Sequence, residues 1–288
     1  NLYFIFMYFN NDSKKKFYDE GFLVLPNFFD ENEVKSIVNL QNRNHYKKDK
    51  NNETVFKKSI KPLADYEDYW HLLSNNKILK TLKNLLDDKI VYLHNSHSVI
   101  QKNEQDIDIN WHRDNACRVF GLGPDWDKKI SYNVLRVAIY LPETDYNTGL
   151  GVIPKTHKDK NYICSILRNI RTKLKRIYHS KYFKFFFNNL FGKNIYVKQG
   201  DCVIFMANLY HRSLSSSGTR RAIFLSYGTN NKHARNYLDY YFHHREDAAE
   251  FKPNTNKIDE NEFKNFLINA GIYIDIPKSK KQKILKDL

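Results

Sequence analysis

Apolar residues in the first part of the chain recur at helical spacing. Asp30 is typical of a helix start, and Glu33 three residues later completes a capping box. A second helix is predicted after Ser74, where leucines and isoleucines share one face. A short apolar strand lies before both, within Gly21–Phe29. We therefore expect residues 7–89 to form a mainly helical N-terminal part.

The pattern changes to short strands from Ile90 onward. Seven segments are rich in β-branched or aromatic residues and are bounded by turn residues. Such a series favours a β-sandwich or jelly roll over alternating strands and helices. We expect residues 90–228 to form a jelly-roll core. The seven segments are KIVYLHN, HSVIQK, NVLRVAIYLPE, GLGVIP, NIYVK, CVIFMA and RAIFLSYG.

Helical spacing returns after Asn230 and predicts a helical C-terminal part at 229–288. Its clearest helix begins at Asp259 and ends at Gly271. The polar stretch 44–58 is predicted to be a loop. We find no repeat and no flexible linker, so we expect one domain at 7–288. Residues 1–6 include NLYF, which resembles an expression scar, and we leave them out of the fold argument.

The charge is strongly basic and unevenly distributed. The 288 residues carry a formal net charge of +15, and 41% of them are hydrophobic. Ten basic and no acidic residues lie between Lys160 and Lys198. Such a segment favours an anionic partner. We expect a basic insertion at 157–198 within the strand region.

Cysteine content and hydropathy indicate where the protein works. The three cysteines are not paired in sequence, which is typical of a reducing compartment. The chain contains no uninterrupted apolar run long enough for a transmembrane helix. We therefore expect a cytoplasmic protein.

A candidate site begins with the segment INWHRDNACRVF. His112 and Asp114 are two residues apart, so in an extended segment both point to one face while Arg113 points away. An imidazole and a carboxylate at this spacing can form an ion pair, an acid–base pair or two metal ligands. The pair alone does not decide among these alternatives.

A third ligand must come from another strand. His94 and His97 are expected on one strand, three apart and facing opposite ways, and His243 and His244 are adjacent. His211 is the best candidate, because it follows an apolar strand and precedes a polar loop. Two histidines and one carboxylate leave three open positions on iron(II), which suits oxygen chemistry.

Four stretches in this order resemble the phytanoyl-CoA dioxygenase family of iron(II)/2-oxoglutarate oxygenases. They are GFLVLPNFFDENEV, WHRDN, NTGLGVIPKTHK, and GDCVIFMANLYHRS followed by RRAIF. The resemblance runs from Gly21 to Tyr227. It implies a mainly β fold with flanking helices around a double-stranded β-helix core, of the jelly-roll or cupin-like type.

The resemblance also assigns the site. It implies that His112, Asp114 and His211 bind Fe(II). An arginine of the last core strand would bind the far carboxylate of 2-oxoglutarate, with Arg220 as the first choice and Arg221 as the alternative. Ser213 matches a serine that assists this arginine, and Lys102 matches a lysine found near the cosubstrate in some relatives.

These assignments predict a non-haem iron(II)/2-oxoglutarate-dependent dioxygenase. It would use O2 to hydroxylate an unactivated C–H bond of a small organic substrate, which the basic charge suggests is anionic, and would release succinate and CO2. Related halogenases lack the carboxylate, so the presence of Asp114 favours hydroxylation. The alternative is a non-catalytic basic jelly-roll module that binds nucleic acid or another anionic polymer, although we expect no specific nucleic acid.

The basic segment has three interpretations. Apolar residues at helical spacing within SILRNIRTKLKRIY predict an amphipathic helix. It could be a solvated cover for the sheet, a lid that binds an anionic substrate, or a surface in peripheral contact with an anionic membrane. We favour the lid among the functional interpretations.

Overall fold

The structure is a computed structural model of the whole chain. It describes residues 11–48, 54–56, 60–86, 89–101, 111–114, 133–142, 148–158, 192–214, 220–243 and 259–274. In this part of the chain, no helix is long and apolar enough to cross a membrane.

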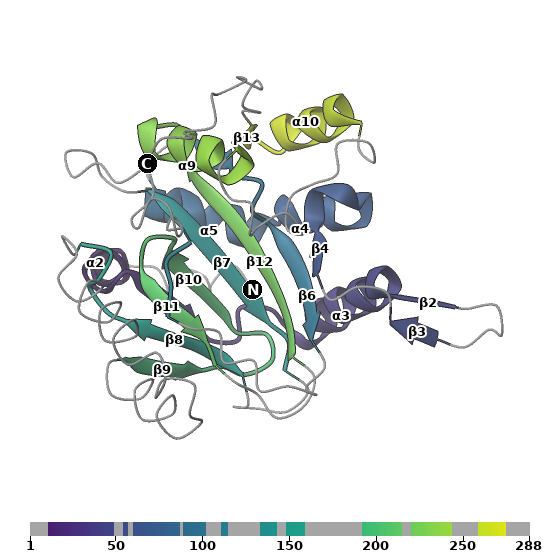
Figure 1. Cartoon of the computed structure of the whole chain (residues 1–288), viewed down its shortest axis with the longest axis horizontal. Coiled ribbons are helices and arrows are strands. Elements are labelled where there is room, and N and C mark those ends of the chain that lie inside the picture. Colours follow the sequence, from purple (N-terminus) through teal and green to yellow (C-terminus); the bar gives the residue numbers. More distant parts are fainter. Residues whose placement is uncertain are drawn as a thin grey trace, which may run out of the picture.

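The larger of two facing sheets has eight strands and forms one side of the core (Figure 1). Its order is β1-β10-β7-β12-β5-β13, and β6 joins it beside the first half of β12, with β4 beyond. All pairs are antiparallel except β13 with β5. The strands are β1 (Phe22–Leu25), β4 (Ile60–Pro62), β5 (Ile90–Tyr92), β6 (His97–Gln101), β7 (Val134–Tyr140), β10 (Cys202–Met206), β12 (Arg220–Thr229) and β13 (Tyr273–Ile274).

A smaller sheet covers one face of the larger one. It has the order β11-β8-β9, with strands β8 (Gly149–Ile153), β9 (Lys193–Tyr196) and β11 (Tyr210–Ser213). Side chains such as Val152 and Ile195 from this sheet share a buried core with Ala138 and Val203 from the larger sheet. Two facing antiparallel sheets of this kind form the jelly-roll core that the strand pattern predicted.

Helices cover the outer face and ends of the larger sheet (Figure 1). The capping box of α3 is present, because Asp30 accepts hydrogen bonds from two backbone N–H groups and the Glu33 side chain accepts one from the backbone N–H of Asp30. Asp259 caps α10 in a similar way, by accepting from Asn261 and Glu262. The helices are α2 (Asn11–Glu20), α3 (Glu31–His45), α4 (Trp70–Leu73), α5 (Asn76–Leu86), α9 (Lys232–His243) and α10 (Glu260–Asn269), with 3-10 turns η1 (Leu63–Asp65) and η2 (Glu67–Tyr69).

The N-terminal part differs from its prediction in one stretch. Residues 44–58 were predicted to be a loop, but α3 continues to His45, and β2 (Tyr46–Lys48) and β3 (Thr54–Phe56) then pair as a hairpin. The prediction was wrong there because backbone pairing does not require the apolar alternation by which strands are recognised. The flanking parts also supply β1, β4 and β13, so the large sheet extends beyond residues 90–228.

The long strand β12 separates the interior of the core from the helical layer. Its residues alternate between the two faces, as in any strand. Ser226 and Phe224 pair with Arg136 and Ala138 of β7 and share their face of the sheet. Tyr227 faces the other way, where its hydroxyl donates to the Leu73 carbonyl at 2.7 Å. The first of these faces carries the candidate site.

Candidate active site

Backbone hydrogen bonds hold the predicted metal-binding segment, residues 111–114, beside β11. The amides of His112 and His211 each donate to the other residue's carbonyl at 2.9 Å. The amide of Asp114 donates to the Ala207 carbonyl, also at 2.9 Å. These bonds bring His112 and Asp114 next to His211, which is distant in sequence.

Arg113 anchors the same segment from its opposite side. Its side chain is buried, and its Nη2 donates to the Thr156 carbonyl at 2.6 Å. Thr156 lies in the turn after β8. Arg113 therefore points away from the two flanking side chains, as the spacing predicted, and ties the segment to the smaller sheet.

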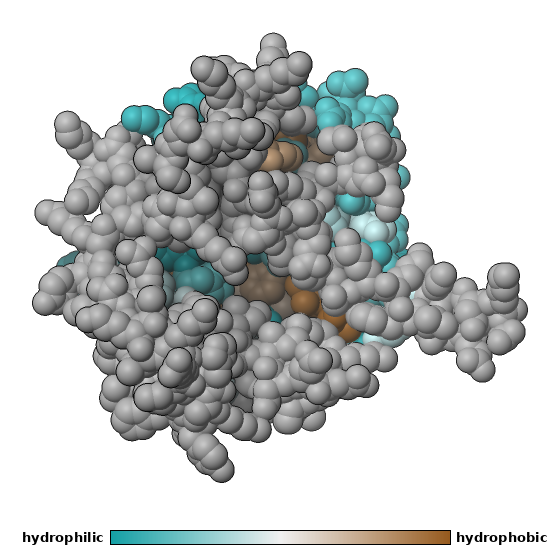
Figure 2. Space-filling model, viewed as in Figure 1, coloured by the Kyte–Doolittle hydropathy of each residue, from teal (hydrophilic) through white to brown (hydrophobic). Residues whose placement is uncertain are grey.

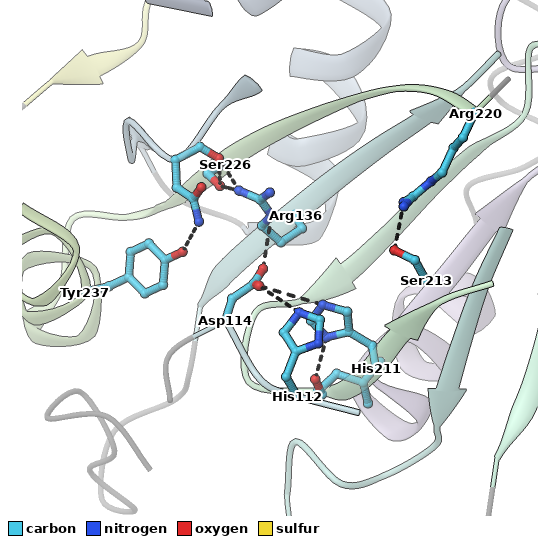
Figure 3. A network of polar contacts seen from close by, with 10 residues as sticks. His112, Asp114, Arg136, His211, Ser213, Arg220, Ser226 and Tyr237 are labelled. Carbon is cyan, nitrogen blue, oxygen red and sulfur yellow. Dashed lines mark hydrogen bonds and ion pairs between the residues drawn. The ribbon is translucent and has the colours of Figure 1, made fainter. Parts of the chain in front are cut away.

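The side chains of His112, Asp114 and His211 converge on one point (Figure 3). One ligand atom from each lies within 4.8 Å of the others. Oδ1 of Asp114 is 3.7 Å from Nε2 of His112 and 3.7 Å from Nε2 of His211. The side chains are 39%, 13% and 6% exposed for His112, Asp114 and His211. The group therefore lies in the interior and opens to solvent on the His112 side.

His211 is held in the form that can bind a metal. Its Nδ1 lies 2.9 Å from the Leu209 carbonyl, which can only accept, so Nδ1 carries the proton and Nε2 has the free electron pair. Burial, and next the nearby charge of His112, lower the pKa of His211 to about 4. The imidazole is therefore neutral near pH 7, and its Nε2 faces Asp114.

Arg136 is a site residue that the sequence analysis missed. It lies within the buried strand β7, is 4% exposed, and its Nε forms an ion pair with Oδ2 of Asp114 at 3.1 Å (Figure 3). The sequence could have indicated its role, because Arg136 is the single charged residue in an otherwise apolar strand, VLRVAIY. A buried charge of this kind normally requires a partner.

Arg220 and Ser213 form a second polar group on the same interior face. Arg220 is 6% exposed, and its Nη2 donates to Oγ of Ser213 at 2.7 Å (Figure 3). No carboxylate in the described part of the chain pairs with Arg220. The buried hydroxyl of Tyr140 also has no hydrogen-bond partner in this part of the chain. Burial lowers the pKa of Arg220, although a guanidinium keeps its charge in proteins.

The two candidate anchors, Arg220 and Arg221, point in different directions. Nη1 of Arg221 donates to Oδ1 of Asn42 in α3 at 3.0 Å, on the helical side of the sheet. Arg220 lies with Ser213, two residues after His211 on β11. The structure therefore brings Arg220, but not Arg221, to the face that carries the candidate metal-binding group. Lys102, the last predicted cosubstrate residue, lies outside the described residues.

His94, His97 and Trp111 lie outside the candidate metal-binding group. His94 lies in the connection between β5 and β6 and not on a strand as expected, so the argument from strand alternation does not apply to it. His97 is tilted on the ring of Phe224 at 5.2 Å between centroids. Trp111 stacks on Tyr210 at 6.0 Å between ring centroids and is buried, so it packs within the fold.

Figure 2 shows hydrophilic and hydrophobic residues side by side near the middle of this face. Part of the predicted basic insertion, residues 159–191, lies outside the described residues, and with it the predicted amphipathic helix.

Comparison with protein-family models and with characterised proteins found no match in sequence. Solved structures do match in fold. The structure of HygX from Streptomyces hygroscopicus, with nickel and 2-oxoglutarate bound, matches with a TM-score of 0.58 and 15% identity over 77% of this chain and 88% of that one. The chain shares the fold of this 2-oxoglutarate-binding protein.

Two further structures share this fold. The non-haem α-ketoglutarate-dependent carbocyclase SnoK from nogalamycin biosynthesis matches with a TM-score of 0.52 and 12% identity, over 77% of this chain and 84% of that one. AviO1 from Streptomyces viridochromogenes Tue57 matches with a TM-score of 0.51 and 16% identity, over 76% and 94%. The narrower resemblance to the phytanoyl-CoA dioxygenase family stays a prediction from the sequence motifs.

Proposed function

We propose that the protein is a non-haem iron(II)/2-oxoglutarate-dependent dioxygenase. It would couple the decarboxylation of 2-oxoglutarate to hydroxylation of an unactivated C–H bond. One oxygen atom of O2 enters the substrate as a hydroxyl and the other enters succinate, with release of CO2. The oxygenase fold supports this class of activity, and the side chains of the interior face support the assignment of roles.

The donor set fits iron(II). Two imidazole nitrogens and one carboxylate oxygen converge from one side, which leaves the opposite positions for other ligands. Hydrogen bonding to the Leu209 carbonyl prepares Nε2 of His211 for a metal. We assign His112, Asp114 and His211 as the ligands. When bound, the metal would supply the oxygen chemistry, and the chain would orient the reactants and exclude water from them.

The observation that carries the proposal is the buried charge of Arg220. An isolated buried guanidinium is costly, and Arg220 has a neutral serine as its hydrogen-bond partner. A carboxylate from a bound ligand would offset this cost, and the guanidinium binds it in a forked geometry. We assign Arg220, with Ser213, to the far carboxylate of 2-oxoglutarate, and keep Lys102 as a predicted contributor.

The spacing of these groups suits a short dicarboxylate. His211 and Ser213 lie on one strand, two residues apart, and therefore about 7 Å apart along it. A five-carbon dicarboxylate can bridge this span, with its keto acid at the metal and its other end at Arg220. The aromatic ring of Phe224 lies beside Arg220, with 6.0 Å between the ring centroid and the guanidinium carbon.

The substrate that we propose is a small organic molecule. HygX has been crystallised with hygromycin B, nickel and 2-oxoglutarate bound, so this fold can accept a small molecule beside the cosubstrate. The net charge of +15 favours an anionic substrate. We keep the lid interpretation of the basic segment within this proposal.

Anaerobic binding of Fe(II) and 2-oxoglutarate tests the proposal without knowledge of the substrate. The wild-type protein should develop the visible absorption of a 2-oxoglutarate chelate of Fe(II), and should release succinate slowly when O2 is admitted. His211→Ala should lose both. His71→Ala is the matched control, because His71 is exposed on α4.

Failure of the folded wild-type protein to bind both Fe(II) and 2-oxoglutarate would contradict the proposal. Salt-sensitive binding of nucleic acid by such an inactive protein would favour the non-catalytic alternative.

A further inference from the structure

Arg136 is a buried cation that the assignment of metal ligands and cosubstrate anchor leaves without a role. It lies in the middle of β7, where each neighbouring residue of the strand is buried and apolar. Burying a guanidinium in such a strand is costly unless several partners satisfy it. Its contacts therefore indicate what it does.

Contacts with β12, with the β5–β6 connection and with Asp114 surround the Arg136 side chain. Its Nη1 donates to the Asn95 carbonyl and to Oγ of Ser226 (Figure 3). Its guanidinium carbon lies 5.6 Å from the centroid of the Phe224 ring. Its Nε forms the ion pair with Oδ2 of Asp114 at 3.1 Å. The guanidinium is thus held by β12 and the β5–β6 connection, and it presents one edge to Asp114.

Further hydrogen bonds connect the groups that contact Arg136, Ser226 and Asn95, to helix α9. Oγ of Ser226 donates to the same Asn95 carbonyl at 2.8 Å. The side-chain amide of Asn95 donates to the hydroxyl of Tyr237, in α9, at 2.8 Å (Figure 3). The position of Arg136 is therefore set by β12 and by the β5–β6 connection, which α9 supports in turn, and not by Asp114 alone.

The two carboxylate oxygens of Asp114 have different partners as a result. Oδ1 is equidistant from the two histidine Nε2 atoms, at 3.7 Å from each. Oδ2 faces Arg136 on the other side. We propose that Arg136 is a positioning residue that makes Asp114 bind the metal through Oδ1 alone. This inference rests on the proposed function, because it concerns the same metal site.

Binding through one oxygen matters for the reaction. If Asp114 bound through both oxygens, the protein would occupy a fourth coordination position on the metal and leave only two open. The proposed reaction needs three, two for the keto acid of 2-oxoglutarate and one for O2. By pairing with Oδ2, Arg136 would keep the third position available for O2. Loss of a group that orients a metal ligand commonly affects metal binding or activity by 10–100-fold.

Cobalt(II) and 2-oxoglutarate are the probes for this role, because the visible spectrum of Co(II) reports its coordination geometry. Arg136→Gln removes the charge, and Arg136→Lys keeps the charge but loses the forked donor set. We expect both variants to change the Co(II) spectrum and to weaken 2-oxoglutarate binding to the Co(II) protein by about tenfold or more. Arg221→Gln is the matched control and should match the wild type in both measurements.

Ser226→Ala provides a milder variant that keeps Arg136. It removes one acceptor of Nη1 and should change the Co(II) spectrum in the same direction by a smaller amount. If the Arg136 variants do not fold, this variant decides, and a wild-type spectrum from it would overturn the proposal.

Other outcomes separate this inference from the proposed function. A wild-type protein that binds neither Co(II) nor 2-oxoglutarate would end the proposed function. If the wild type binds both and Arg136→Gln is identical to it, only the role of Arg136 is wrong. An Arg136→Lys protein identical to the wild type would show that charge alone suffices, which also overturns positioning by the guanidinium.

Discussion

Arg220 and Arg221 are adjacent in sequence but have opposite surroundings. Arg220 is buried against Ser213, whereas Arg221 is partly buried and bonds to Asn42 in α3. The alternation of a strand produces this difference, because neighbouring side chains point to opposite faces. Their chemical similarity makes them a matched pair for testing the cosubstrate site.

Arg220→Ala should raise the 2-oxoglutarate requirement steeply. Loss of one partner of a buried charge pair costs roughly 3–5 kcal/mol, which corresponds to a change in affinity of over a hundredfold. Titration of the Fe(II) protein with 2-oxoglutarate under anaerobic conditions would measure it. Arg221→Ala should leave this affinity near the wild-type value. If Arg221→Ala weakened 2-oxoglutarate binding more than Arg220→Ala does, Arg221 would be the anchor.

His94 is a buried residue whose ionisation affects stability and not the proposed chemistry. Neither of its ring nitrogens has a hydrogen-bond partner in the described part of the chain. The His94 ring contacts two aromatic rings, that of Phe242 at 5.1 Å and that of Tyr92 at 4.9 Å between centroids. Burial in these surroundings lowers the pKa of His94 to about 3.

The free energy of unfolding should therefore fall as the pH falls from about 6.5 toward 3. In this window the unfolded chain binds a proton at His94 and the folded chain does not, so protonation favours unfolding. One pKa unit corresponds to about 1.4 kcal/mol, so His94 contributes on the order of 4 kcal/mol across the window. Above it His94 is neutral in both states, and this contribution to stability is fully present.

Urea unfolding of His94→Asn between pH 7 and pH 4 would measure this contribution. Asparagine does not titrate, and it tolerates the positive φ of 56° at this position. The variant should be less stable at pH 7 because it loses aromatic packing, but its stability should depend less on pH. An unchanged dependence would show that His94 is not the cause.

At the scale of elements, β8 links the metal site to the edge of the smaller sheet. Val152 of β8 pairs with His211, and Gly149 pairs with Tyr196 of β9. A Cβ at Gly149 would lie 2.0 Å from the carbonyl oxygen of Ile195, which is backbone and cannot rotate away. Glycine at 149 therefore permits the close approach of the two strands.

Gly149→Ala should move β9 away from β8 and destabilise the protein by roughly 1–3 kcal/mol. Because β8 also pairs with the strand that carries His211, we expect weaker Co(II) binding. Gly271→Ala is the control, since a Cβ there meets nothing within 4 Å and only its φ of 75° is unfavourable. That control should lower the unfolding midpoint but leave Co(II) binding unchanged, and equal Co(II) binding by both variants would contradict the link.

At the scale of the whole molecule, the terminal parts and the jelly roll share one core. Phe263 of α10 packs on Trp70 of α4 at 5.0 Å and on Tyr92 of β5 at 5.6 Å between ring centroids. All three belong to the same buried cluster, which also includes strands of both sheets. This continuity supports the proposal of one domain across residues 7–288.

Phe263→Ala should therefore lower the stability of the entire fold by about 3–5 kcal/mol. Urea unfolding should remain one transition, with tryptophan fluorescence and far-ultraviolet circular dichroism giving the same midpoint. The conservative Phe263→Leu should cost less. Separate transitions for the two signals would show that α10 and the jelly roll unfold independently, which would contradict the single domain.

Local features of the fold could be predicted from sequence alone. The capping box at Asp30, the helix after Asp259 and most core strands follow from side chains close together in the chain. The shared direction of His112 and Asp114 is local for the same reason, since strand geometry relates residues two apart. Short-range geometry therefore determined these elements and two of the three candidate ligands.

Only the tertiary structure decided which distant residues meet. It pairs Arg136 with Asp114, turns Arg220 toward Ser213, and adds β1 and β13 to the large sheet. It also forms the β2–β3 hairpin in a polar stretch. Strand pairing and the burial of a charge depend on partners that lie far away in the chain and are chosen by packing of the whole core. The role of a single charged residue such as Arg136 is therefore visible only once those partners are in place.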